Sequence, residues 1–146
     1  MNSKSKSLNK SDVSGFDFAK EMLCNDPTAG INFDRIQVHP DRGYIIFEYL
    51  LCEESQPYVT PFTSHPKRYW HKNSRKFLSL WKIVTDLNGT LYLVNYAKAG
   101  TSHDDEILVI EVHEMDSSGI KKETQTKYSR DDFSFWFRQL NKECLG

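Results

Sequence analysis

The sequence predicts an α+β domain, in which a central mixed sheet of about four or five strands carries helices on its faces. Two observations predict this class. Two runs of β-branched and aromatic residues flank the segment 39–43, whose Pro, Asp and Gly are typical of a hairpin turn. Farther along the chain, apolar residues recur at helical spacing and are followed by two more strand-like segments.

The N-terminal part of the chain is predicted to form a tail and then a helix. Residues 1–13 are rich in Ser, Lys and Asn, which is typical of a flexible terminus, so 14–146 is expected to form a single domain. Ser14 is a good N-cap and would precede a helix over about 16–24. The buried face of this helix would consist of Phe16, Ala19 and Leu23.

The hairpin is expected next, with strands near 31–38 and 44–52. If the hairpin folds about Asp41, Asp34 lies directly opposite Glu48, because side chains alternate between the faces of a strand. A long loop that contains several prolines follows the second strand. Long ordered loops in compact domains are often functional.

The second half of the chain is predicted to hold two helices and two strands. A basic segment at 67–76 leads into a helix whose apolar residues follow a 3.6-residue period up to Leu87. Strands are expected at 90–97 and 106–115. The pattern Ser-Arg-Asp-Asp at 129–132 resembles a capping box and predicts a last helix.

Composition and charge exclude several classes of protein. The formal net charge of −1 excludes a globally basic nucleic-acid binder, so a nucleic acid would have to contact a local patch. The apolar runs are too short to span a bilayer, and the N-terminus lacks the hydrophobic segment of a signal peptide. We therefore expect a cytoplasmic protein without membrane contact, whose widely spaced cysteines are reduced thiols.

The acidic pair in the hairpin is the first candidate site. Opposed residues on antiparallel strands have Cβ atoms about 4.5–5.5 Å apart, and like charges there are destabilising. Asp34 and Glu48 would be compatible if a cation lay between them or if one were protonated. Mg²⁺ or Mn²⁺ in this place would polarise a phosphoryl group and lower the pKa of a bound water. The alternative is that both carboxylates face solvent.

A basic-aromatic segment is the second candidate site. Cations bind phosphates, and aromatic rings stack on unpaired bases, so the segment predicts a contact with DNA or RNA. The alternative is a solvated helix face with two aromatic residues in the core. The side chains concerned are Lys67, Arg68, Tyr69, Trp70, His71, Lys72, Arg75 and Lys76.

The order of these parts resembles the PD-(D/E)XK nuclease superfamily, which includes restriction endonucleases and Holliday-junction resolvases. The resemblance covers roughly 16–112; Asp34 matches the first acid of the motif and Glu48 the second. Glu21 occupies the place where the first helix often supplies a further acidic metal ligand, and the alternative is a solvated charge on the face of that helix. The resemblance implies a restriction-endonuclease-like fold, Mg²⁺- or Mn²⁺-dependent cleavage of DNA and a homodimer.

The chain differs from the family motif at the position of the motif lysine. It should stand two residues after Glu48, where this chain has Leu50. That lysine stabilises the negative charge that develops during cleavage. A basic residue of the neighbouring helix would take over this role, and Lys67 and Lys72 are the expected catalytic groups, with Arg75 and Lys76 as further candidates. The alternative is an inactive nuclease fold that serves as a nucleic-acid or protein interaction module.

Overall fold

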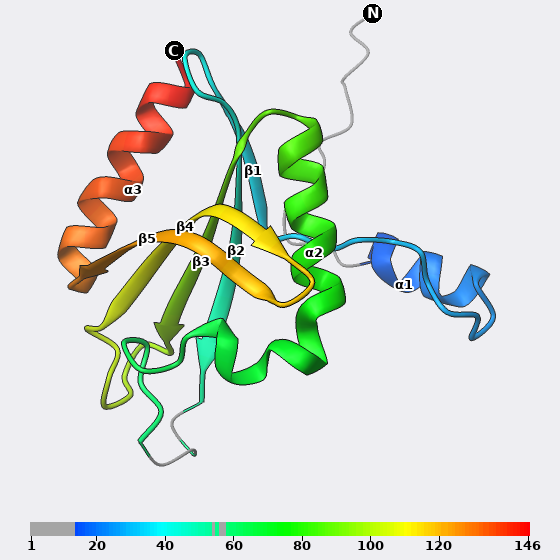
Figure 1. Ribbon diagram of the computed structural model, residues 1–146, viewed down its shortest axis with the longest axis horizontal. Helices are drawn as coiled ribbons and strands as arrows, with labels where there is room; N and C mark the ends of the chain where they lie inside the picture. Colours follow the sequence, from blue (N-terminus) through cyan, green and yellow to red (C-terminus); the bar gives the residue numbers. More distant parts are fainter. Residues whose placement is uncertain (1–13, 54, 56–57) are drawn as a thin grey trace, which may run out of the picture. The chain divides into compact units, whose positions relative to one another are not determined.

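The computed structural model describes residues 14–53, 55 and 58–146 and confirms the predicted α+β class (Figure 1). The predicted tail lies outside these residues. Contacts divide the chain into two units, Met1–Gly30 and Ile31–Gly146, so we treat each unit separately. None of the helices in the described ranges is long and apolar enough to cross a membrane.

The N-terminal unit contains the helix α1 (Ser14–Met22). It begins at the predicted cap residue and ends slightly before the predicted position. None of its described residues is buried, and Phe16 is 60% exposed. The predicted buried face with Ala19 and Leu23 is therefore not formed among residues 14–30, because these residues contain no second helix or strand for α1 to pack against.

The strands β1 (Arg35–His39) and β2 (Gly43–Cys52) form the predicted hairpin. Their Cα partners follow the register of a hairpin folded about Asp41. This register brings Asp34, the residue just before β1, opposite Glu48. The first strand is shorter than predicted, so the second half of β2 is paired with the next strand of the sheet but not with β1.

A crossover connects the hairpin to the rest of the sheet. After β2, the chain forms the short helix η1 (Pro66–Tyr69) and the helix α2 (Trp70–Asp86), and then returns as β3 (Thr90–Ala97). Because of this crossover, β3 pairs parallel to β2. The strands β4 (Ile107–Asp116) and β5 (Gly119–Tyr128) follow antiparallel, which gives the described sheet the order β1-β2-β3-β4-β5.

Two helices cover opposite faces of the sheet, α2 on one and α3 (Arg130–Cys144) on the other (Figure 1). Alternation along β2 supplies both cores, since Ile46 packs under α2 and Phe47 packs under α3. The core under α2 includes Phe77 and Leu80 from the helix. Both faces are thus buried where the helices lie, and β2 runs between them.

The strand β5 is the element that the sequence pattern does not predict. Its sequence, GIKKETQTKY, has little apolar alternation, and most of its residues are exposed. It is an edge strand of the described sheet, where polar and charged residues reduce unwanted strand pairing. Its place in the sheet comes from pairing with β4 and not from burial of its own side chains.

The loop after β2 is held by a buried asparagine. Asn95 on β3 is fully buried, and its Nδ2 donates to the carbonyl oxygens of Pro61 at 3.1 Å and Ser64 at 2.8 Å. His65 accepts a backbone N–H at Nδ1, which leaves Nε2 to donate to Glu123 at 2.7 Å. These bonds fix the part of the loop that approaches Glu48.

Candidate active site

Glu48 is a carboxylate buried on the face of the sheet that α2 covers. Its neighbours on this face, Ile46 and Leu50, belong to the apolar core, and the Glu48 side chain is only 4% exposed. Its Oε1 accepts from Lys76 Nζ at 2.5 Å. Oε2 accepts no hydrogen bond from a donor of the described residues, and a hydrogen bond with the Asp34 carboxyl forms only when one of the two carboxyls keeps a proton. A buried polar atom without a partner is costly, so Oε2 is suited to a ligand that carries positive charge.

Asp34 lies beside Glu48, at the point where the hairpin opens. The Tyr49 N–H is beyond the reach of β1, because that strand begins only at Arg35. Asp34 Oδ2 accepts this N–H at 2.8 Å and so takes the place of the missing strand partner. The two carboxylates are therefore held on neighbouring positions by the backbone of the sheet.

The surroundings of Glu48 raise its pKa above the ordinary value of 4.5. Burial is the largest cause, because it disfavours the charged form. The hydrogen bond and the positive charge of Lys76 lower the pKa, whereas the negative charge of Asp34 and a hydrogen bond with its side chain raise it. Asp34 and Glu48 can thus lie side by side when one of the two carboxyls keeps its proton or when a further cation binds between them.

Lys76 is the cation that the structure brings to this pair. Lys76, one of the further candidates from the sequence, is the described lysine that contacts Glu48, and the catalytic roles of Lys67 and Lys72 stay predictions. Lys72 lies one helical turn before Lys76, on the same side of α2. It is therefore a neighbour of the Glu48 contact and does not form it.

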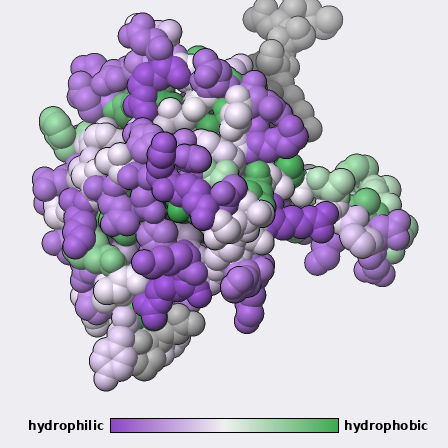
Figure 2. Space-filling view, in the orientation of Figure 1, coloured by the Kyte–Doolittle hydropathy of each residue, from purple (hydrophilic) through white to green (hydrophobic). Residues whose placement is uncertain are grey.

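The cationic side chains of the basic segment lie at the surface. Figure 2 shows that hydrophilic side chains dominate the visible face of the Ile31–Gly146 unit. Arg68 lines a cleft of about 570 Å³ together with Glu48 and Lys76, and Ser64 of the preceding loop forms part of its wall. The exposed cationic and histidine side chains of the segment 67–76 are Lys67, Arg68, His71, Lys72, Arg75 and Lys76.

The two aromatic residues of the basic segment have different positions. Trp70 is 6% exposed, its Nε1 donates to the Ser117 carbonyl at 3.1 Å, and its ring stacks on Phe77. Its predicted role in base stacking is therefore corrected to a role in the core. Tyr69 is half-buried and lines the cleft, and burial raises the pKa of its phenol to about 12.

A metal ion would have to use the acidic pair and ligands from solvent or substrate. Within the described ranges, no group of three or more His, Cys, Asp or Glu residues is arranged to hold a metal ion. Mg²⁺ is commonly bound by one or two carboxylates, with water and phosphate oxygens as its other ligands. Glu21 lies on α1 in the separate unit, and its role as a further ligand stays a prediction.

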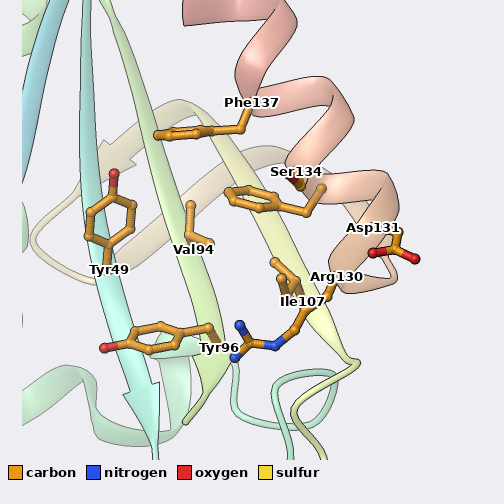
Figure 3. A pocket seen from close by; sticks show the side chains of 9 residues that line it. Tyr49, Val94, Tyr96, Ile107, Arg130, Asp131, Ser134 and Phe137 are labelled. Atoms are coloured by element: carbon orange, nitrogen blue, oxygen red, sulfur yellow. The ribbon is translucent and has the colours of Figure 1, made fainter. Parts of the chain in front are cut away.

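A second cavity, of about 600 Å³, lies on the opposite face of the sheet, beside α3 (Figure 3). Tyr49 and Tyr96 come from the sheet, and Arg130 and Phe137 come from α3. Sequence patterns did not indicate this cavity, because its residues are far apart in the chain and each fits an ordinary core or cap position.

Comparisons of this chain with protein-family models, with curated proteins and with solved structures give no match.

The raised pKa of Glu48 predicts a pH-dependent stability difference between the wild type and Glu48→Gln. A carboxyl whose folded pKa is raised stabilises the fold fully below its unfolded pKa, near 4.5, and this contribution is lost as pH rises through the folded pKa. Urea unfolding at several pH values should show the wild type losing stability relative to Glu48→Gln as pH rises. A difference that does not vary with pH would contradict the raised pKa.

Proposed function

We propose that this protein is a metal-dependent phosphodiesterase that binds nucleic acid and cleaves DNA. The observation that carries the proposal is the Glu48 carboxylate, which is buried, bonded to Lys76 through one oxygen and without a described partner at the other. Asp34 adds a second carboxylate at the neighbouring position. Buried charge of this kind destabilises a fold, and it is commonly found where a protein binds a ligand or performs catalysis.

Asp34 and Glu48 would hold the Mg²⁺ or Mn²⁺ ion. The bound ion would supply Lewis-acid polarisation of the phosphoryl group and a lowered pKa for a nearby water. In the hydrolysis, the water oxygen forms a new bond to phosphorus, the phosphorus bond to the leaving sugar oxygen breaks, and that oxygen receives a proton. Lys76 would stabilise the negative charge that develops on the phosphoryl oxygens.

The exposed cations of α2 would hold the substrate backbone. Lys72 and Arg75 lie in the first turns of the helix, and Arg68 lies just before it in η1. The first turn of α2 contains no acidic residue, and the positive end of a helix dipole favours anions. A chain with a net charge of −1 thus has a local region suited to phosphates.

Lys76 also supports the resemblance to PD-(D/E)XK nucleases. Leu50 occupies the position of the motif lysine, and a lysine of α2 contacts Glu48 instead. This supports an active enzyme over an inactive module of the same fold. The cytoplasmic location and a homodimer are parts of the same proposal, and both derive from the sequence and the resemblance.

The proposal is tested with the full chain, labelled linear and branched DNA, and single-stranded RNA. We expect cleavage of DNA with Mg²⁺ or Mn²⁺, no cleavage with EDTA, and Mn²⁺ binding by calorimetry. Binding that weakens with salt but shows no metal-dependent turnover would support an interaction module instead. A protein that binds neither Mn²⁺ nor nucleic acid would overturn the proposal.

A further inference from the structure

The cavity beside α3 has the walls of a site for a planar ring. It lies over the carboxyl halves of β2 and β3, and Figure 3 shows side chains from the sheet and from α3 that line the same space. Most of its lining is aromatic or aliphatic. Aromatic rings stack on any of the nucleobases, because every base presents a flat π-face. The aromatic residues of the cavity are Tyr49, Tyr96, Phe133 and Phe137.

A fixed positive charge accompanies these rings. Arg130 donates from Nε to the Asp104 carbonyl at 2.5 Å and from Nη2 to the Ala97 carbonyl at 2.6 Å. No carboxylate of the described residues forms an ion pair with this guanidinium. The carboxylate of Asp131 also lines the cavity, so the polar part of the lining holds a cation and an anion beside the aromatic walls. This combination suits a flat ring that carries both hydrogen-bond donors and acceptors.

Tyr49 connects this cavity to the proposed phosphate site. Its ring lines the cavity, and its backbone N–H holds Asp34 Oδ2 at 2.8 Å. Glu48 is its neighbour in β2 and faces the other side of the sheet. Since β1 begins only at Arg35, no described strand covers the edge of β2 at Tyr49 on that side. Tyr49 itself lines both the cavity and the cleft.

We propose that the cavity binds one unpaired nucleobase of the strand whose phosphate lies at Asp34 and Glu48. This inference rests on the proposed function and names its substrate class, a nucleic acid with unpaired nucleotides such as a single strand, a flap or a bulge. A base within a continuous duplex would first have to be unstacked and unpaired, which costs several kcal/mol in general and favours substrates where the base is already free.

A filled cavity tests this inference. Ser134 lines the cavity from the exposed side of α3, so Ser134→Trp would occupy the space without replacing a core residue. The matched control is Phe135→Trp, because Phe135 is 68% exposed and does not line the cavity. Fluorescence anisotropy in EDTA and low salt would measure the affinity for a labelled single strand of about 12 nucleotides, with site sizes of this order being common.

We expect Ser134→Trp to weaken binding of the single strand about tenfold, and Phe135→Trp to change it less than about twofold, since one stacked base contributes on this scale. The wild type should also prefer the single strand to a blunt duplex of equal length. Circular dichroism would establish that both variants are folded. In addition, adenosine should shift the amide signals of α3 and β3 in the wild type, a measurement that needs no variant.

Equal affinities of the two variants for the single strand, or adenosine without effect on α3 and β3, would overturn the inference. Because these measurements are made without metal, they are separate from the Mn²⁺ and cleavage assays. A protein that cleaves DNA but tolerates Ser134→Trp would retain the proposed function and lose the base site.

Discussion

Glu48→Gln is expected to abolish metal-dependent cleavage and Mn²⁺ binding together, while the fold is retained. Gln has nearly the same shape but lacks the charge that would attract a divalent ion to the buried position. Loss of Lewis-acid stabilisation worth several kcal/mol corresponds to a fall of about 100-fold or more in the cleavage rate. Single-turnover cleavage and calorimetric titration with Mn²⁺ would measure the two effects.

Glu114→Gln is the matched control for this change. Glu114 is an exposed carboxylate on β4 that pairs with Lys122 at 3.4 Å, so the same chemical replacement is made away from the cleft. We expect cleavage and Mn²⁺ affinity close to those of the wild type. If Glu48→Gln still bound Mn²⁺ with undiminished affinity, Glu48 would not be a metal ligand.

Lys76→Met is expected to separate cleavage from metal binding. Without the ammonium group, the developing negative charge loses a stabilising partner, and the cleavage rate should fall by about 100-fold. The affinity for Mn²⁺ should be retained or increased, because the ammonium group of Lys76 on Oε1 repels a cation that binds Oε2 of the same carboxylate. A lower cleavage rate without a lower Mn²⁺ affinity would show that Lys76 acts in cleavage and not in metal binding.

Lys82→Met provides the corresponding control on the same helix. Lys82 is 77% exposed and pairs with Asp86 at 3.0 Å, so its replacement leaves the cleft unchanged. A parallel loss of Mn²⁺ binding and cleavage in Lys76→Met would contradict the repulsion and indicate that Lys76 mainly holds the site together.

The hairpin was predictable because its information is local. Pro, Asp and Gly mark the turn, and the alternation of strand side chains then determines which residues face each other. The pairing of Asp34 with Glu48 followed from the turn alone, and the observed register agrees with it. The apolar period of α2 and the capping pattern before α3 were readable for the same reason.

The residues that the sequence did not reveal depend on tertiary packing. Which lysine reaches Glu48 depends on where α2 begins and how it crosses β2, and α2 begins at Trp70, inside the basic segment. Trp70 is buried because the core under α2 extends to the first turn of the helix. The edge strand β5 buries little apolar surface, so its sequence lacks the alternation of apolar and polar residues that predicts a strand.

The length of the hairpin turn determines which residue on the β1 side of the hairpin lies opposite Glu48. A change of one residue in the pairing of β1 with β2 would rotate every side chain of β1 to the other surface. Asp34 would then be replaced opposite Glu48 by Phe33 or Arg35. An insertion or deletion in the turn, at a distance from the proposed chemistry, would thus take the Asp34 carboxylate away from Glu48 without changing the Asp34 codon.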